Sequence, residues 1–478
     1  MIYKYYGPPG TGKTYKLISR ARAYQRAGTR LDRIGYFAFT RKAAKEAKER
    51  MPVDDKKLPY FQTFHSFAYK TLQLNEENVM QPIHYELLGK KLGIRVSYVD
   101  KYNDEETTFL SCNNPYFQLI NRAINKDIDI EDEFNLAEHD RAEINWDTLN
   151  HIYKNFLVYK KYHKLYDFND MIKMLIDYDK IPKFDVVFID EAQDLSPLQW
   201  KLYDKLKETT KNIYLAGDDD QAIFAWAGAD VDRFINEPAK EKVLRYSKRI
   251  SRAVQQASGT PISRIIGLRR EKEYLPRDFE GESLYISSLN QIDLKKGKWL
   301  ILARTKDQVL EIMKELYEKN LYYQSNKGKS FKVKMYKRIK NYLNWVNNDA
   351  QLDEKQWKDI LEYTDKKVIE EKYNWYDLFT KIPEKDKNYI QSLMEQGEDL
   401  DSKARIWVST IHAIKGGEED NVILCMYQGI KIQTSIKRST AKNDEEHRVW
   451  YVGITRARNN LYKLKTDDKD KEYKIYDK

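Results

Sequence analysis

The feature that most constrains this chain is a glycine-rich segment near its start, placed between a strand pattern and a helix pattern. The segment reads Gly7-Pro8-Pro9-Gly10-Thr11-Gly12-Lys13-Thr14. Residues 2–6 are predicted to form a short strand and residues 15–26 a helix, the setting in which this spacing forms a phosphate-binding loop. Backbone N–H groups of such a loop turn toward phosphate oxygens, and the helix N-terminus adds partial positive charge. Lys13 is expected to reach the β- and γ-phosphates, and Thr14 to bind Mg²⁺.

Two acids follow a second predicted strand. Residues 184–189 are mostly apolar, as expected of a strand buried in a parallel sheet, and Asp190 and Glu191 come directly after them. Carboxylates at that end of a strand face the crevice where α/β sheets bind ligands. We expect Asp190 to hold Mg²⁺, directly or through water, and Glu191 to orient and deprotonate the attacking water. These residues indicate an NTP hydrolase, a description that also fits AAA+ remodellers, transporter ATPases and small-molecule kinases.

Length and composition exclude several other classes. A chain of 478 residues is long enough for about three domains, or for two with insertions. Its two cysteines, Cys112 and Cys425, are too few for a disulfide framework, a four-cysteine zinc site or an iron–sulfur cluster. The sequence has no long apolar run and no signal peptide pattern, so a cytoplasmic protein without membrane partners is expected. The net charge of +10 is compatible with a polyanion partner but does not establish one.

Further motifs follow in a fixed order along the chain. They are Ile34-Gly35-Tyr36-Phe37-Ala38-Phe39-Thr40 with the helix pattern from Arg41, Gln62-Thr63-Phe64-His65-Ser66-Phe67, and the segments 215–230, 409–418 and 451–458. With the phosphate-binding loop and the two acids, this series closely resembles the superfamily 1 DNA helicases of the UvrD, Rep and PcrA type. The resemblance covers nearly the whole chain, from Gly7 to Arg458. It implies an α/β fold with two RecA-like P-loop NTPase domains, helical insertions, and ATP with Mg²⁺ at the interdomain cleft.

The same resemblance divides the chain into four parts. The first RecA-like domain is expected at residues 1–69 and 165–240, interrupted by a helical insertion at 70–164. The second RecA-like domain is expected at 241–325 and 400–470, interrupted by a shortened second insertion at 326–399.

The resemblance also implies the roles of individual residues. Gly7 to Thr14 are expected to bind the nucleotide, and Glu418 to contact its ribose. Lys13 and Glu191 are expected to act in catalysis together with Gln221, which links the γ-phosphate to the DNA site. Two arginine fingers, Arg456 and Arg249, are expected from the second domain. Arg249 is chosen because residues 244–251 resemble the family's Asn-Tyr-Arg-Ser segment.

Eight residues are expected to contact DNA. Three are aromatic side chains that would stack on bases, with core packing as the alternative for each. The others lie in motifs that line the backbone path, and the histidines are interpreted as polar contacts because no metal-ligand set lies near them. These residues are Phe64, Phe224 and Trp226 among the aromatics, and Thr40, Arg41, His65, Thr410 and His412 along the path.

The function implied is an ATP-dependent 3′-to-5′ single-stranded DNA translocase and helicase, acting on single strands and on junctions with duplex DNA. One alternative is a translocase that does not unwind alone, because the second insertion is shortened. Another is a DNA-binding accessory protein with a silent ATPase, against which the intact catalytic residues argue. RNA is a less favoured substrate, because the motif details match the DNA branch. No protein partner can be named.

The two insertions carry opposite charge patterns. The first holds an acidic run, interpreted as a solvated face with partner binding as the alternative: Asp127, Asp129, Glu131, Asp132, Glu133, Glu138, Asp140 and Glu143. The second begins with a basic stripe that fits either a solvated face or contact with a DNA backbone: Lys327, Lys329, Lys332, Lys334, Lys337, Arg338 and Lys340.

Two departures from the family concern the nucleobase. Relatives carry a glutamine motif some twenty residues before the phosphate-binding loop, where this sequence has only six residues before Gly7. Relatives also stack a tyrosine on adenine at the position of Lys248. We therefore expect GTP or CTP to support turnover within about tenfold of ATP, unless Tyr3, Tyr6 or another residue contacts the base instead.

Overall fold

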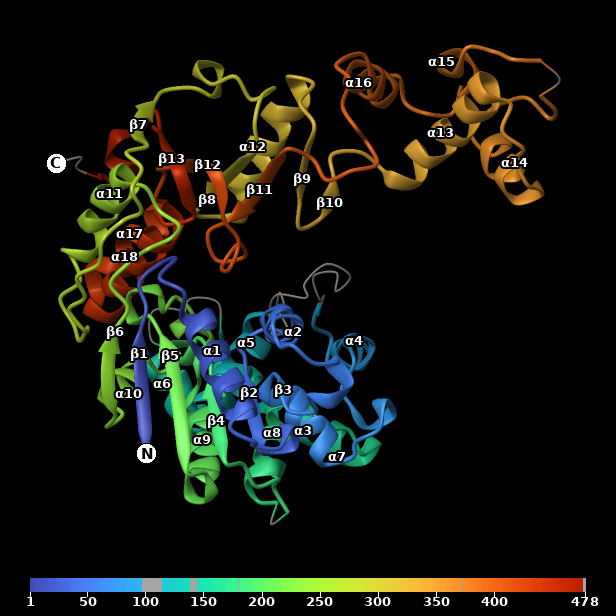
Figure 1. The fold of residues 1–478 in the computed structure, drawn as a ribbon. Coiled ribbons are helices and arrows are strands. Elements are labelled where there is room, and N and C mark those ends of the chain that lie inside the picture. Colours follow the sequence, from blue (N-terminus) through green and yellow to red (C-terminus); the bar gives the residue numbers. More distant parts are fainter. Residues whose placement is uncertain (97–113, 138–143, 179, 370, 476–478) are drawn as a thin grey trace. The chain divides into compact units, whose positions relative to one another are not determined.

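The computed structural model describes residues 1–96, 114–137, 144–178, 180–369 and 371–475 (Figure 1). It divides into two compact units. Unit 1 contains Met1–Ser283, Gln428–Asn460 and Tyr473–Lys478, and unit 2 contains Leu284–Tyr427 and Leu461–Glu472.

Unit 1 is built on a six-stranded sheet with the order β3-β2-β4-β5-β1-β6, in which the paired strands run parallel. The strands are β1 (Ile2–Tyr6), β2 (Ile34–Phe37), β3 (Phe61–Gln62), β4 (Val186–Ile189), β5 (Asn212–Gly217) and β6 (Lys240–Val243). Because the paired strands are parallel, their carboxyl ends meet at one edge. The register pairs Tyr6 with Gly217 and Phe37 with Ile189, which brings the segments after β1, β2, β4 and β5 together.

Helices cover both faces of this sheet, which explains why β4 is buried at every position. One face carries α1 (Lys13–Arg26) and α2 (Arg41–Glu49), whose apolar side chains pack in one cluster with β2 and β4. The other face carries α3 (Phe64–Thr71), α8 (Phe168–Ile176), α9 (Pro197–Thr209) and α10 (Val231–Asn236). This arrangement is an α/β fold, as predicted from the sequence.

The predicted first insertion, residues 70–164, is helical where the structure describes it. Its helices are α4 (Pro82–Lys91), α5 (Pro115–Lys126), α6 (Ile130–Leu136) and α7 (Trp146–His163). They share a hydrophobic core of their own, with Phe117, Ile120 and Phe156 almost fully buried. The acidic run is partly internal: Glu133 is 1% exposed and pairs with Arg122 and Lys126, so a fully solvated face is wrong for this residue. Glu138, Asp140 and Glu143 lie outside the described residues.

Unit 1 also contains helices from later in the chain. They are α11 (Arg252–Ile262), α17 (Ile430–Arg438) and α18 (Thr440–Ile454), and α18 packs against both of the others. The sequence places these segments in the second RecA-like domain. In the structure they form one compact unit with the phosphate-binding loop. The boundaries of the two compact units therefore differ from the predicted domain boundaries.

Most of unit 2 surrounds a seven-stranded sheet with the order β10-β9-β11-β8-β12-β13-β7. Its strands are β7 (Glu282–Ile286), β8 (Trp299–Ala303), β9 (Tyr323–Ser325), β10 (Gly328–Lys329), β11 (Ile406–Thr410), β12 (Glu419–Cys425) and β13 (Ala457–Leu464). The central strands β8, β9, β11 and β12 pair in parallel, and β10 forms an antiparallel hairpin with β9. Helix α12 (Lys306–Glu318) packs on this sheet, with Ile312 and Leu316 buried in its core.

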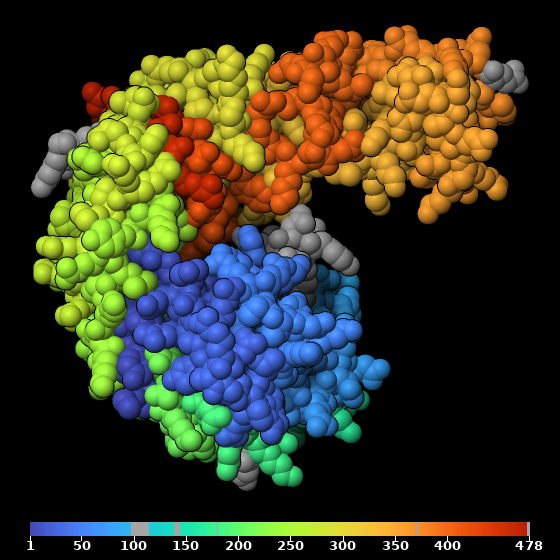
Figure 2. Space-filling model, viewed as in Figure 1, coloured from blue at the N-terminus to red at the C-terminus, as the bar shows by residue number. Residues whose placement is uncertain are grey.

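The predicted second insertion also has its own core. It contains α13 (Val333–Asn348), α14 (Glu354–Leu361), α15 (Trp375–Leu378) and α16 (Glu384–Glu395). Ile339, Ile360 and Ile390 are fully buried in a cluster that also includes Phe331 from the segment before α13. In Figure 2 the second insertion, drawn in orange, forms a packed body.

No helix within the described residues is long and apolar enough to span a bilayer.

Candidate nucleotide site and nucleic-acid contacts

The glycine-rich segment forms the turn from β1 to α1, as predicted. Gly10 and Gly12 adopt φ angles of 73° and 83°, a region that other residues rarely enter. A Cβ atom at Gly7 would overlap the Lys13 side chain, and one at Gly10 would overlap Arg249. Lys13 is 9% exposed, and its Nζ donates to the Gly7 carbonyl at 3.0 Å. The loop therefore curls around the lysine head group, which is the cradle that a triphosphate requires.

A hydroxyl and a carboxylate meet beside this loop. Thr14 Oγ1 donates to Asp190 Oδ2 at 2.6 Å, and the Tyr36 hydroxyl donates to the same oxygen at 2.9 Å. Burial and the charge of Glu191 raise the pKa of Asp190 to about 6, although Thr14, Lys13 and Tyr36 act in the opposite direction. Hydroxyl and carboxylate oxygens of this kind bind Mg²⁺ together with phosphate oxygens and water. Thr14 and Asp190 therefore fit the predicted metal ligands.

The second acid, Glu191, is held by two neighbours. Its backbone is left-handed, with a φ of 54°, and one carboxylate oxygen lies 3.8 Å from Lys13 Nζ. Gln193 Nε2 donates to the other oxygen at 2.7 Å, and Gln193 Oε1 accepts from the Asp218 N–H at 3.0 Å. Gln193 is fully buried. It orients the predicted water-activating acid, a role that sequence reasoning did not assign to it.

Gln221 and Arg456 are brought together. Arg456 Nη2 donates to Gln221 Oε1 at 3.0 Å, and Gln221 Nε2 donates to Asp218 Oδ2 at 2.6 Å. Arg456 is 2% exposed, and its Nε donates to the Val452 carbonyl at the end of α18. The predicted γ-phosphate sensor and the predicted finger are thus members of one buried hydrogen-bond network.

A buried lysine that the motif analysis did not identify, Lys272, contacts Asp218 of this network. Lys272 Nζ lies 3.1 Å from Asp218 and 2.9 Å from Asp220, and it also contacts Asp219. Burial alone lowers the pKa of Lys272, but the three carboxylates raise it above its ordinary value. Arg269 adds a two-bond pair with Asp220, at 3.0 Å each. Three consecutive buried acids need such cations, and that need is the sequence signal that could have pointed to them.

The segment before α11 lies against the phosphate-binding loop. Ser247 Oγ donates to the Pro9 carbonyl at 2.7 Å, and the Lys248 N–H donates to the Gly10 carbonyl at 2.9 Å. These contacts place Arg249 beside Gly10, and its role as an arginine finger remains a prediction. Lys248 Nζ lies 5.6 Å from the ring centroid of Tyr15, a side chain that is 63% exposed.

Neither tyrosine that was considered for the nucleobase is available to it. Tyr6 is fully buried, and Tyr3 stacks on Tyr214 with ring centroids 4.7 Å apart. Tyr15, which directly follows Thr14, is the exposed ring beside the phosphate-binding loop.

The three aromatic residues predicted to bind bases differ in exposure. Trp226 is 46% exposed, and its backbone N–H donates to Glu445 Oε1 at 3.3 Å. Phe224 is 4% exposed and stacks on Phe39. Phe64 is also 4% exposed and stacks on Phe37 in the core beneath β2. In this structure Trp226 is open to a base, whereas base stacking by the two phenylalanines remains a prediction that requires their rings to leave the core.

The remaining predicted DNA contacts in unit 1 lie around the starts of α2 and α3. Thr40 Oγ1 accepts from the Ala43 N–H and caps α2, and Arg41 is exposed on its first turn. His65 is buried on α3, with an edge contact to Phe168, and burial lowers its pKa to about 4. His65 is therefore neutral near pH 7.

Three predicted residues lie in unit 2. Thr410 ends β11, and its Oγ1 accepts from the Ala413 N–H at 3.2 Å. Burial lowers the pKa of the nearby His412 to about 3, with Arg304 and Lys415 adding to the shift. Glu418 directly precedes β12. Among the described residues, no group of three or more His, Cys, Asp or Glu side chains is placed to hold a metal ion.

Comparisons with known proteins identify the family of this chain. Residues 5–242 match the family model of the UvrD/REP helicase N-terminal domain, and residues 385–467 match that of the UvrD-like helicase C-terminal domain. A probable DNA helicase II homologue of Mycoplasma capricolum is 25% identical over 82% of this chain and 60% of its own length. A probable DNA helicase of Mycoplasma pneumoniae is 24% identical over 96% of this chain and 79% of its own. An ATP-dependent DNA helicase PcrA of Leuconostoc citreum is 26% identical over 48% of this chain and 32% of its own. The chain thus spans between a third and four-fifths of these relatives.

Proposed function

The chain belongs to the UvrD/Rep helicase family, and from this premise we propose that it is an ATP-dependent 3′-to-5′ single-stranded DNA translocase and DNA helicase. The observation that carries the proposal is the network around Gln221. It joins the finger Arg456 to Asp218 within the same unit as the phosphate-binding loop and the Thr14–Asp190 pair.

Each part of the site has one task in hydrolysis. ATP with Mg²⁺ supplies the phosphoryl group and its charge neutralisation. Loop amides and Lys13 bind the phosphates, and Thr14 and Asp190 hold the cation. Glu191, kept in place by Gln193, orients the attacking water and accepts its proton. Arg456 and Arg249 stabilise the charge that develops on the transferred group.

Coupling to DNA is proposed to run through one short segment. Gln221, in contact with Arg456, lies five residues before the exposed Trp226. A movement of Gln221 on phosphate release is therefore transmitted over a few residues to a ring that can stack on a base. Stacking on an indole is worth roughly 1–3 kcal/mol per base and tolerates any sequence. Alternating strong and weak stacking would move the protein along a single strand.

Strand displacement tests this proposal. Duplexes that are identical apart from a 3′ or a 5′ single-stranded tail are incubated with ATP, and Lys13→Ala serves as the inactive control. Unwinding from the 3′ tail alone is the expected result. Unwinding from the 5′ tail alone would contradict the polarity while keeping the ATPase chemistry.

Two other functions are outcomes of the same experiment. If neither tail supports unwinding but single strands stimulate ATP hydrolysis, the chain is a translocase that needs a partner, which would fit the shortened second insertion. If single strands bind without any hydrolysis, it is an accessory protein with a silent ATPase. The fully assembled Lys13, Thr14, Asp190 and Gln221 contacts make this last outcome the least expected.

A further inference from the structure

The turn that presents Trp226 consists of small residues and has little packing of its own. Residues 224–229 read Phe-Ala-Trp-Ala-Gly-Ala, with a single 3₁₀ turn at the tryptophan. The buried residues of the hydrophobic cluster beneath this turn are Phe39, Phe224 and Ala227. The indole itself is 46% exposed. A ring that projects from such a small turn depends on further contacts to keep its orientation.

One such contact comes from the first insertion. Asn125, near the end of α5, is 7% exposed, and its Nδ2 donates to the Ala227 carbonyl at 2.9 Å. The next residue of the turn, Gly228, has a φ of 96°, and a Cβ atom there would lie 3.0 Å from Asn125 Cβ. Glycine permits both this backbone conformation and so close an approach. The backbone of the turn is therefore shaped to pack directly against Asn125.

The end of α5 is in turn fixed to the body of unit 1. Asp127 directly follows α5, and its carboxylate pairs with Lys173 of α8 at 3.2 Å and with Lys201 of α9. Helices α8 and α9 pack on one face of the six-stranded sheet. Asn125 thus holds the turn from a helix end that is anchored to the sheet.

A second contact reaches the neighbouring backbone group from far along the chain. Glu445 Oε1, on α18, accepts from the Trp226 N–H at 3.3 Å. A carboxylate acceptor makes a stronger hydrogen bond than a neutral one. Helix α18 ends two residues before the predicted finger Arg456, whose Nη2 donates to Gln221 Oε1 at 3.0 Å. The helix that leads into this arginine therefore also contacts the backbone of the exposed ring.

We propose that Asn125 and Glu445 are positioning residues for single-stranded DNA binding, which hold the turn at Ala227 and Trp226 so that the indole is presented to a base. The inference rests on the proposed function, since it takes Trp226 as a base-stacking residue. A ring that is already ordered in its binding orientation pays less entropy when DNA binds, and this raises affinity. The first insertion thereby contributes to DNA binding through Asn125 without touching the strand.

The test asks whether the two side chains act through the indole. Asn125→Ala and Glu445→Ala are each made in the wild type and in Trp226→Ala, and fluorescence anisotropy measures affinity for a labelled single-stranded oligonucleotide. In the wild type each change should weaken binding by about two- to tenfold, the usual contribution of one hydrogen bond. In Trp226→Ala the same changes should cause no further loss, because changes that act through one side chain are not additive.

Charge and folding are controlled separately. Glu445→Gln removes the same charge as Glu445→Ala but keeps an oxygen that can accept from the Trp226 N–H, so it should bind DNA as the wild type does. Equal losses in the two variants would show that the charge matters and not the hydrogen bond, and would overturn the role of Glu445. Thermal unfolding verifies that each variant folds. If Asn125→Ala does not fold, the two Glu445 variants still decide the result.

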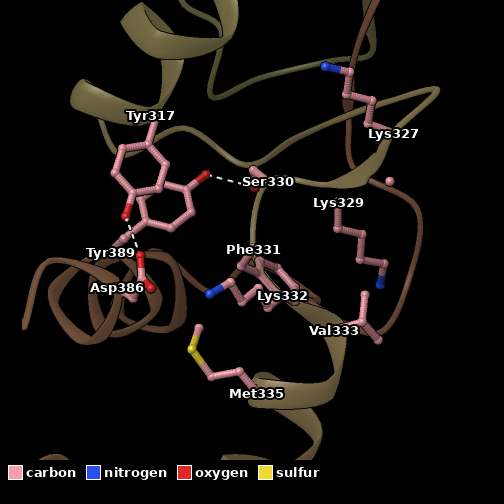
Figure 3. Close-up of a pocket in the computed structure, with 11 residues that line it drawn as sticks. Tyr317, Lys327, Lys329, Ser330, Phe331, Lys332, Val333, Met335, Asp386 and Tyr389 are labelled. Carbon is pink, nitrogen blue, oxygen red and sulfur yellow. Dashed lines mark hydrogen bonds between the residues drawn. The ribbon is translucent and has the colours of Figure 1, made fainter. Parts of the chain in front are cut away.

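Two further control variants lose one side-chain hydrogen bond away from the turn. Asn155→Ala removes a donor to the His151 carbonyl at 2.9 Å, within α7 of the same insertion. Tyr317→Phe acts in unit 2, where the Tyr317 hydroxyl donates to Asp386 at 3.1 Å in a pocket of about 440 Å³ (Figure 3). Neither change should alter affinity for the oligonucleotide. A loss in either control equal to that of Asn125→Ala would contradict a specific role for Asn125.

The outcomes separate this inference from the proposed function. If Trp226→Ala weakens binding but the Asn125 and Glu445 changes cost the same in both backgrounds, or nothing in either, the inference is overturned and stacking on Trp226 stands. If Trp226→Ala binds the oligonucleotide as the wild type does, stacking on Trp226 fails and the inference fails with it. Failure of the wild-type protein to bind single strands would refute the proposed function itself.

Discussion

Two regions of this molecule carry clustered positive charge, and they hold that charge in opposite ways. In unit 1, Lys13 is bonded to the Gly7 carbonyl and Arg456 to Gln221, with both side chains at most 9% exposed. In unit 2, Lys327 and Lys332 project from the rim of a pocket without partners among the described residues. The first set of cations is fixed before any ligand arrives, and the second is free to adjust.

The difference bears on what each region can do. Cations held in place cost little reorganisation when charge develops, so they can favour a transition state over a ground state. Flexible, solvated lysines bind any phosphate within reach, and their contribution falls as salt increases. Removing a cation from unit 1 should therefore reduce turnover, while removing one from unit 2 should reduce only salt-sensitive binding.

The largest effect is expected for Arg456→Ala. Loss of an arginine finger reduces turnover by roughly 10³–10⁵-fold, because the charge on the transferred group loses its stabilisation. ATP hydrolysis in the presence of single-stranded DNA measures turnover, and a nucleotide-binding titration shows that the loss is not one of affinity.

Arg448→Ala is the matched control for that variant. Arg448 lies on the same helix, is 7% exposed, and donates to the Leu268 carbonyl at 3.1 Å. Its removal should lower thermal stability yet leave turnover within about tenfold of wild type. Equal losses of turnover in both variants would mean that Arg456 acts by holding α18 and not as a finger.

A loss of kcat on the order of 10² is expected for Lys272→Met. This change leaves Asp218, Asp219 and Asp220 without their shared cation, so Asp218 can no longer hold Gln221 against Arg456. The measurement is steady-state ATP hydrolysis with and without DNA, and kcat should fall much more than KM rises.

Lys160→Met tests whether this effect is merely structural. Lys160 is buried to a similar degree and pairs with Asp167 and Asp170 at 2.5 and 2.7 Å, away from the Gln221 network. Breaking either buried cluster should cost roughly 3–5 kcal/mol of stability. If both variants lose stability and kcat alike, Lys272 has no specific role in positioning Gln221.

The next effect concerns Trp226, the exposed member of the aromatic set. Trp226→Ala should weaken single-strand binding by roughly 1–3 kcal/mol, or about 5- to 150-fold, because one stacking surface is lost. Fluorescence anisotropy with a labelled oligonucleotide measures this affinity. Tyr162→Ala, at a residue of α7 that is 81% exposed, should leave it unchanged. A loss at Tyr162 equal to that at Trp226 would indicate a general effect of surface aromatics.

Sequence reasoning identified those parts of the nucleotide site in which spacing along the chain fixes the chemistry. The glycines, Lys13 and Thr14 lie in one contiguous segment, and Asp190 directly follows its strand. A short sequence motif is therefore enough to identify each of them. Both the α/β class and the Thr14–Asp190 contact follow from strands whose carboxyl ends share one edge.

Residues that act through tertiary contacts could not be found in this way. Lys272 is 54 residues from Asp218, and nothing local in its sequence shows that it neutralises three acids. The sequence shows the basic stripe, but whether one of its members has an acidic partner depends on distant residues: Asp401 pairs with Lys340 and Glu362 with Arg338. In the same way, the motif pattern does not show that the ring of Phe64 lies against Phe37 in the core.

The smallest effect is expected for the choice of nucleobase, that is, for turnover with GTP or CTP compared with ATP. Lys13 is held in a rigid site, whereas the side chains that we expect to lie beside the base are the exposed Tyr15 ring and Lys248. GTP and CTP should therefore support turnover within about tenfold of ATP, a difference of about 1.4 kcal/mol. Tyr15→Ala should raise KM severalfold for all three nucleotides, whereas Lys248→Tyr should raise the preference for ATP by adding a second ring. A hundredfold preference for ATP in the wild type would show that a fixed contact to adenine exists, and loss of that preference in Tyr15→Ala would assign the contact to this ring.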